Sequence, residues 1–201
     1  MSDARVFCLD LATMTGWAFV DLADRDAQPE CGRWDLSAPW GNTRPAKIDS
    51  FSYRMGEVLE ERRPTMLAVE APLVPNHGAA GRFDVNALMT SWGLFTHSEL
   101  IARRHGLSFR SINTTEIKKI ATGHGARWKQ PDGSWKSPDK HLVLEGMKAR
   151  WPGITPDDHN VADALAIGTL MIAERWGSGS PAVKPSIKIP PRKTRGRRPT
   201  K

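Results

Sequence analysis

Three acidic residues stand in stretches that otherwise carry the apolar side chains of a protein core. Asp10 lies inside VFCLDLA, Glu70 directly follows the apolar run of LAVEAP, and Asp163 precedes the apolar part of NVADALAIG. A buried carboxylate is costly unless it is paired or holds a metal. Any one of these acids could be a salt bridge or a helix cap, but three together favour a shared role.

A shared role for the three acids requires a cation, because carboxylates crowded together repel one another. Ligands that are all oxygen suit Mg²⁺ or Mn²⁺ rather than Zn²⁺. Two such ions about 4 Å apart can activate a water and stabilise the leaving oxygen when a phosphodiester is cleaved. The residue types therefore predict metal-dependent hydrolysis of a phosphodiester.

Three segments of the chain resemble one family. FCLDLATMTGWAFVD, LAVEAP and NVADALAIG resemble the RuvC family of the RNase H-like (retroviral integrase) superfamily, in this order, over roughly residues 5–175. In that family the first strand carries an Asp before a Thr/Gly turn, the fourth strand ends in Glu, and the last helix reads [D/H]xxDALAIA. The resemblance implies that Asp10, Glu70 and Asp163 are the catalytic, metal-binding carboxylates.

The fourth position of the family's site departs from the pattern. The family usually has Asp or His three residues before the last Asp, and this chain has Asn160 there. Asn160 can give a metal one neutral oxygen but cannot act as a base. If the start of the helix shifts, Asp158 can replace it as a ligand and His159 as a proton acceptor. The alternative is that Asp157 and Asp158 cap the helix.

Two further segments are candidates for binding DNA phosphates. The turn ATMTG places Thr13 and Thr15 near the expected metal site, where hydroxyls and backbone N–H groups can meet a phosphate. RuvC-like proteins also have a stretch resembling KK…GxGxAxK that meets phosphates, and here it reads EIKKIATGHGAR. The residues that this resemblance implies are Lys118, Lys119, His124 and Arg127.

An insertion, WKQPDGSWKSPDK, follows this stretch and departs from the family pattern. Trp128 and Trp135 lie beside Lys129 and Lys136 in it. Exposed tryptophans can stack on unpaired bases while the lysines meet phosphates. The alternative is a β-hairpin whose tryptophans pack on the domain.

The segment 72–86, PLVPNHGAAGRFDVN, is rich in Gly and Pro and has no periodicity. By the resemblance it lies over the active-site groove and reads the DNA branch, with His77 and Arg82 as candidates for phosphate contact. On the following helix, Trp92 and Phe95 could form a dimer interface, because RuvC resolvases pair through this helix. They could equally belong to the core of the chain itself.

The elements that must position these residues follow from hydrophobic periodicity. Alternating, β-rich segments predict strands at 5–12, 15–23, 32–37, 65–72 and 107–112. Helical spacing of apolar residues predicts helices at 44–63, 84–105, 114–121 (capped by Asn113 or Thr114), about 139–151 and from about 157 onward.

This order of elements predicts an α/β protein. Its mixed five-stranded sheet, three antiparallel strands and then two more, is flanked by helices, as in the RNase H-like fold. If the first and fourth strands are adjacent, Asp10 and Glu70 lie side by side, and the last helix can bring Asp163 against both.

Composition divides the chain into two parts. A length of 201 residues suits one domain, predicted at 1–176, plus a tail. The tail, 177–201, has four Lys, four Arg and no acid, so it carries +8 while the whole chain carries +7. It is rich in Pro, Gly and Ser, which predicts disorder. It could be a solubilising end or a flexible arm that binds phosphates.

Composition also narrows the cellular setting. The chain has no apolar run of about 18 residues that could span a bilayer. Its N-terminus has no secretory segment. Cys8 and Cys31 are isolated, so a disulfide framework or a zinc site is not expected. We expect a cytoplasmic protein with Mg²⁺ or Mn²⁺ and no organic cofactor.

These observations predict a divalent-metal-dependent endonuclease for branched DNA, similar to a Holliday junction resolvase and working as a homodimer. The inserted loop and the basic tail suggest a bacteriophage or prophage type. One alternative is a RuvC-like nuclease acting on flaps, forks or other DNA. Another is a non-catalytic DNA-binding protein of the same fold.

Overall fold

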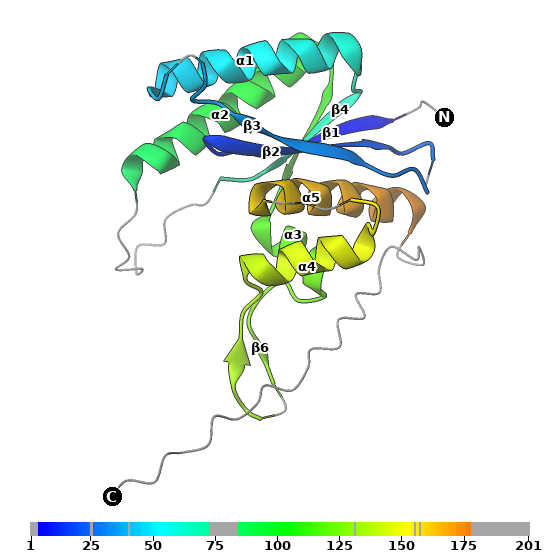
Figure 1. Cartoon of the computed structure of the whole chain (residues 1–201). Helices are drawn as coiled ribbons and strands as arrows, with labels where there is room; N and C mark the ends of the chain where they lie inside the picture. Colours follow the sequence, from blue (N-terminus) through cyan, green and yellow to red (C-terminus); the bar gives the residue numbers. More distant parts are fainter. Residues whose placement is uncertain are drawn as a thin grey trace, which may run out of the picture.

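A five-stranded sheet forms the centre of the molecule (Figure 1). The computed structural model describes residues 4–24, 26–39, 41–72, 84–130, 132–154, 156 and 158–177. The strand order is β3-β2-β1-β4-β5. β1, β2 and β3 pair antiparallel, whereas β4 pairs parallel with both β1 and β5. The strands are β1 Arg5–Asp10, β2 Met14–Asp21, β3 Glu30–Asp35, β4 Met66–Glu70 and β5 Ser108–Ile112.

Helices cover both faces of this sheet (Figure 1). Two helices lie on one side of the sheet and three on the other. The first pair is α1 Arg44–Glu61 and α2 Val85–Arg104. The opposite side carries α3 Thr114–Thr122, α4 Lys140–Arg150 and α5 His159–Trp176, where α5 packs on the strands and α3 and α4 pack against α5. The predicted α/β architecture, with a mixed five-stranded sheet flanked by helices, is confirmed.

Strand β1 explains why both layers are needed. Its side chains alternate between the two faces, so Val6 and Cys8 enter one core while Phe7 and Leu9 enter the other. A strand buried on both faces reads as a continuous apolar run, as this one does up to Asp10.

Helix α5 is the main cover of its face. It contacts β1, β2, α3 and α4, and most of its length is buried. Small residues allow this close approach: a Cβ added at Gly168 would lie 2.8 Å from Cγ1 of Val20 on β2. The run of small and apolar residues in ADALAIG is therefore the surface that seats α5 on the sheet.

Polar side chains fix where the helices start. Asn113 caps α3 in a capping box with Glu116, as one of the two predicted alternatives had it. Asp84, Asp139 and Asp158 cap α2, α4 and α5. The third strand lies slightly earlier than predicted, because its pairing with β2 runs from Glu30 to Asp35.

The inserted segment forms a small hairpin of two short strands, β6 Trp128–Lys129 and β7 Trp135–Lys136. Residues 73–83, with His77 and Arg82, and residues 178–201 of the basic tail lie outside the described residues. None of the helices in the described part of the chain is both long and apolar enough to cross a membrane.

Candidate metal centre and nucleic-acid interface

The sheet topology brings three acids together. β1 and β4 run parallel and adjacent, so Asp10 and Glu70, at their carboxyl ends, meet at one edge of the sheet. α5 packs across β1 and β2 and adds Asp163 from its first turns. One carboxylate oxygen of each acid lies within 4.8 Å of the others. These three residues are called the acidic triad below.

The triad is electrostatically strained without a cation. The pKa of Asp10 lies well above its usual range, first because the carboxyl is buried and then because Glu70 and Asp163 are negative neighbours. Burial, followed by the charge of Glu70, raises the pKa of Asp163 to about 7. An oxygen-only donor set that resists ionisation in this way could bind a divalent metal.

Two lysines face this negative charge. Lys140 opposes the rise in the pKa of both Asp10 and Asp163, and Lys118 opposes it for Asp163. Lys118 belongs to the predicted phosphate-binding stretch. Lys140, the first residue of α4, was not predicted, because it is the last residue of the inserted segment and only the packing of α4 brings it to the triad.

A hydroxyl group orients one of the acids. Oγ1 of Thr114, at the start of α3, donates a hydrogen bond of 2.6 Å to Oε1 of Glu70. β5 ends beside β4, so the residues that begin α3 come to lie next to the end of β4. Sequence reasoning missed this residue, although Thr114 was a candidate cap.

The triad lies in a cleft with a volume of about 760 Å³. The cleft is lined by residues from β1, β4 and four helices, so a bound group would be surrounded on several sides. Its polar and charged lining includes Thr13, Thr114, Lys118, Lys140 and Asn160 in addition to the triad. The structure thus brings six of the predicted site residues to one place.

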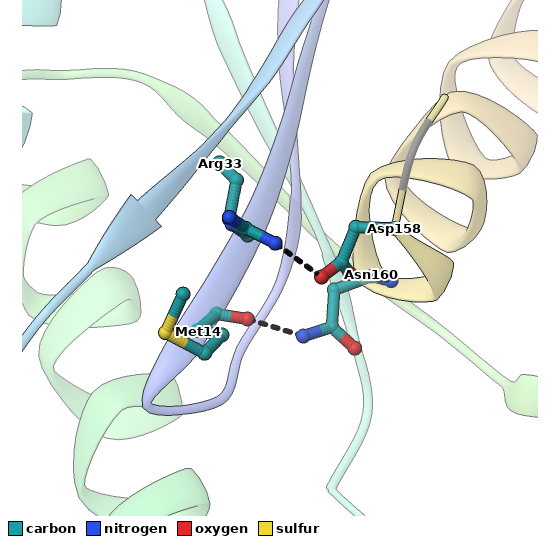
Figure 2. A network of polar contacts seen from close by, with 4 residues as sticks. All are labelled: Met14, Arg33, Asp158 and Asn160. Atoms are coloured by element: carbon teal, nitrogen blue, oxygen red, sulfur yellow. Dashed lines mark hydrogen bonds and ion pairs between the residues drawn. The ribbon is translucent and has the colours of Figure 1, made fainter. Parts of the chain in front are cut away.

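Backbone contact positions the start of α5. A Cβ added at Gly16 of β2 would lie 2.0 Å from the backbone oxygen of Asn160. Nδ2 of Asn160 donates a hydrogen bond to the carbonyl oxygen of Met14, and Oδ1 points away from that strand (Figure 2). Gly16 in the TMTG segment is therefore required for close packing rather than for a turn.

Asp158 is engaged outside the triad. Its Oδ1 accepts the backbone N–H of Asn160 at 2.7 Å, and its Oδ2 pairs with Nη1 of Arg33 on β3 at 2.8 Å (Figure 2). These two partners hold the pKa of Asp158 below its usual value against the opposing effect of burial. Asp158 therefore forms the helix cap, which was the alternative to a role as a metal ligand.

Asn160 and His159, the other two candidates for the fourth position of the site, lie in different surroundings. Asn160 lines the cleft, whereas His159 is exposed and does not line it. Asn160 is thus the residue of this cluster that the structure brings near the acidic triad. Asp157 lies outside the described residues.

The two threonines of the first turn also differ. Thr13 lines the cleft, as a phosphate-binding role requires. The prediction that Thr15 contacts DNA is wrong: its side chain is fully buried, and its hydroxyl donates to the carbonyl oxygen of Ala12 at 2.7 Å. The alternating pattern of β2 turns Thr15 into the protein.

The other predicted DNA contacts among the described residues do not line the cleft. Lys119, His124, Arg127 and Lys129 are exposed, and Lys136 is half-buried. All five lie on α3, on the loop that follows it or on the hairpin. They form a basic border on the α3 side of the molecule.

Solved structures share this architecture. RuvC of Thermus thermophilus aligns with a TM-score of 0.58 and 19% identity, over 88% of this chain and 97% of that chain. The chain has the RuvC fold. T. thermophilus RuvC in complex with a Holliday junction substrate gives a TM-score of 0.61 and 20% identity, over 86% and 95% of the two chains.

A eukaryotic protein shares the RuvC fold as well. The yeast mitochondrial Holliday junction resolvase Ydc2 aligns with a TM-score of 0.54 and 12% identity, over 87% of this chain and 79% of that chain. No family model and no curated protein matches the sequence. The segments around the triad predicted a resemblance to RuvC, and the solved structures show this resemblance in the fold.

Proposed function

We propose that this chain is a divalent-metal-dependent endonuclease that cuts branched DNA in the manner of a Holliday junction resolvase. The observation that carries the proposal is the acidic triad, whose oxygens lie within 4.8 Å of one another in an open cleft. The RuvC fold supports it, because T. thermophilus RuvC has been solved with a Holliday junction substrate.

Asp10, Glu70 and Asp163 would hold the metal, with Asn160 contributing a neutral oxygen. The donor set consists of oxygens alone, which fits Mg²⁺ or Mn²⁺. When bound, a pair of such ions activates a water for attack on phosphorus and stabilises the leaving oxygen. We assign Asp158 and His159 to the start of α5 rather than to this ligand set.

Other residues of the chain would place the phosphate. Lys118, Lys140 and the hydroxyl of Thr13 line the cleft and offer donors to phosphate oxygens. Thr114 fixes the orientation of Glu70 through its 2.6 Å hydrogen bond. The exposed Lys119, Arg127 and Lys129 would attract the flanking backbone.

The substrate could also be a flap or a fork. The hairpin between α3 and α4 favours this second candidate, because it adds an exposed tryptophan and basic residues beside the cleft. A non-catalytic DNA-binding protein of the same fold is the third reading, and it requires that the triad bind no metal.

Helix α2 would form the interface of a homodimer. Val85, Met89 and Trp92 follow one another at helical spacing and are 61%, 48% and 40% exposed. Such a stripe is costly to leave in water and is typical of an interaction surface. Trp92→Glu should therefore convert a dimer to a monomer in analytical ultracentrifugation, whereas Glu60→Gln, at an exposed site on α1, should not.

Cleavage of defined DNAs tests the proposal. The purified protein would be incubated with Mg²⁺ and labelled four-way junctions, flaps, forks and duplexes, and the cuts would be mapped. Asp10→Asn, Glu70→Gln and Asp163→Asn should each lose more activity than the 10–100-fold typical of changes outside the ligand set. They should still bind junctions, because the phosphate-binding surface remains.

Two results would contradict the proposal. If the wild type cuts none of these DNAs in Mg²⁺ or Mn²⁺ but binds them, the non-catalytic reading holds. If one of the three variants cuts at a rate near that of the wild type, the residue changed is not a ligand.

A further inference from the structure

The β6–β7 hairpin occupies a defined place beside the cleft. It joins α3 to α4, and both helices contribute to the cleft lining, through Thr114 and Lys118 on one side and Lys140 on the other. The chain returns from the hairpin directly into Pro138, which also lines the cleft. In Figure 1 the hairpin projects away from the body, beyond α3 and α4.

The hairpin is ordered by its own contacts. The backbone N–H of Gln130 donates to the Ser134 carbonyl at 2.8 Å, and that of Gly133 donates to the Gln130 carbonyl at 2.9 Å. Oδ1 of Asp132 accepts from both the N–H and the hydroxyl of Ser134. A turn closed in this way presents its side chains in fixed positions, which lowers the entropy cost of binding.

The pleat separates the hairpin side chains into two faces. Trp128 lies opposite Lys136, and Lys129 lies opposite Trp135. Residues directly opposite one another share a face, and successive residues alternate. One face therefore carries Trp135 with Lys129, and Arg127 falls on the same side.

The two tryptophans have different surroundings. Trp128 stacks on His124, with ring centroids 4.1 Å apart and an angle of 8° between the planes. This contact attaches the base of the hairpin to the loop after α3. Trp135, in contrast, is 60% exposed, and its ring contact is the Arg127 guanidinium 6.0 Å from the ring centroid.

A purely structural role explains Trp128 but not Trp135. An indole that served only to stabilise the fold would bury its surface against the body, since the gain scales with the apolar area removed from water. The Arg127 guanidinium lies 6.0 Å from the centre of the Trp135 ring, and most of that tryptophan stays open to solvent. An open aromatic face between two cations is typical of a surface that stacks nucleobases and attracts phosphates.

We propose that Trp135 is a stacking platform for an unpaired nucleobase at the branch of the bound DNA, with Arg127 and Lys129 binding the adjacent phosphates. This inference rests on the proposed DNA-binding function and adds a preference for branches that carry unpaired nucleotides. Trp135 is three residues from Pro138 at the cleft, or about 10 Å along an extended chain. A base stacked there would belong to a nucleotide close to the one in the cleft.

Binding measured without divalent metal tests this proposal separately from cleavage. The probes are a fully paired four-way junction and the same junction with two unpaired adenines at its branch. Trp135→Leu removes the aromatic face, whereas the matched variant Trp135→Phe keeps one. We expect Trp135→Leu to weaken binding of the unpaired-adenine junction by about tenfold, and of the paired junction by less than about twofold. Trp135→Phe should retain most of the affinity.

A 2-aminopurine in place of one unpaired adenine reports stacking directly. Its fluorescence should be quenched on binding the wild type and Trp135→Phe, but not on binding Trp135→Leu. Lys129→Gln and Lys136→Gln remove the same charge from opposite faces, so the first should weaken binding of the unpaired-adenine junction more than the second.

The proposal is overturned if Trp135→Leu and Trp135→Phe behave alike, if both junctions lose affinity equally, or if the two lysine variants are equivalent. Glu60→Gln, at an exposed site on α1 on the opposite side of the sheet, serves as the control, because it should quench 2-aminopurine as the wild type does. Absence of cleavage with normal quenching would refute the nuclease function and leave the stacking platform standing. Cleavage by the wild type, with equal quenching in Trp135→Leu and Trp135→Phe, would refute the stacking platform and leave the nuclease function standing.

Discussion

Thr114 shows how a residue outside the acidic triad can govern it. Its hydroxyl donates to Glu70 at 2.6 Å and fixes the direction in which that carboxylate points. Thr114→Val keeps the shape of the side chain and removes the donor. Because changes to such supporting partners typically cost 10–100-fold, we expect a loss of cleavage activity in that range.

Thr114→Ser is the matched control, since it keeps the hydroxyl and should cleave nearly as the wild type does. Rates would be measured under single-turnover conditions at saturating Mg²⁺. Equal activity of the valine and serine variants would show that the hydrogen bond does not support Glu70 in the reaction.

Asp163 links the stability of the metal-free protein to pH. Its pKa rises from 3.8 in the unfolded chain to about 7 in the folded chain, because burial and Glu70 disfavour the charge. The folded state therefore holds more protons between these values, and stability falls as pH rises through this window. Asp163→Asn should stabilise the metal-free protein at pH 8 by up to about 4 kcal/mol, and by little at pH 4.

Thermal unfolding in EDTA checks this prediction. A gain of that size corresponds to at most about 8–16 °C in melting temperature for a domain of this length. Mg²⁺ should raise the wild-type melting temperature more at pH 8 than at pH 5, since a ligand must be ionised to bind. An equal Mg²⁺ shift in Asp163→Asn would contradict the assignment.

At the scale of elements, the close packing of α5 on β2 depends on Gly16. A Cβ there would lie 2.0 Å from the backbone oxygen of Asn160, so Gly16→Ala must displace the start of the helix that carries Asp163. We expect a loss of about 1–3 kcal/mol of stability, as in other overpacked sites, together with weaker cleavage.

Gly56 provides the control for this substitution. It lies within α1, and a Cβ added there meets nothing within 4 Å. Gly56→Ala should therefore stabilise the protein by about 0.5–1 kcal/mol through helix propensity. Denaturant unfolding of both variants tests this prediction. If Gly16→Ala leaves the stability unchanged, α5 is free to shift.

The order and type of the main elements could be predicted from the sequence because the apolar residues of each strand and helix follow the spacing typical of that element. β1 is a continuous apolar run that ends in Asp10, and α5 is bounded by its cap at Asp158. Thr15 was misjudged because its neighbours in the chain suggested a turn, while pairing with β3 makes it an inward residue of β2. The pattern of the inserted segment was too short to choose between a loop and a hairpin.

Parts of the candidate site depend on contacts that no local pattern contains. Lys140 and Thr114 reach the acidic triad only through the packing of α4 and α3. The pairing of Asp158 with Arg33 joins residues far apart in the chain. The acidic triad itself could be predicted because a carboxylate in an apolar run is unusual wherever it occurs.

At the scale of the whole molecule, charge is divided between the body and the tail. Residues 177–201 carry +8, whereas the chain as a whole carries +7. Each phosphate contact releases counterions and steepens the fall of log affinity with log salt by about 0.9. A variant that ends at Trp176 should therefore bind all DNA more weakly and with a shallower salt dependence.

Titrations at several salt concentrations, on junction and on duplex, would check this prediction. The ratio of the two affinities should stay unchanged, because geometry is read by the cleft and its border rather than by charge alone. An unchanged salt slope would show that the tail does not bind DNA. A changed ratio would show that it also contributes to selectivity.

Helix α5 has a further consequence when the protein is made on the ribosome. The ribosome synthesises Asp10 and Glu70 early, whereas Asp163 is added only with α5, the last helix of the described residues. A chain interrupted before that helix lacks the third acid and leaves β1 and β2 uncovered on one face. Such a fragment can neither complete the acidic triad nor shield its sheet from water. If the chain is the nuclease proposed above, unfinished chains cannot cut nearby DNA, and the ability to cut arises together with the finished fold.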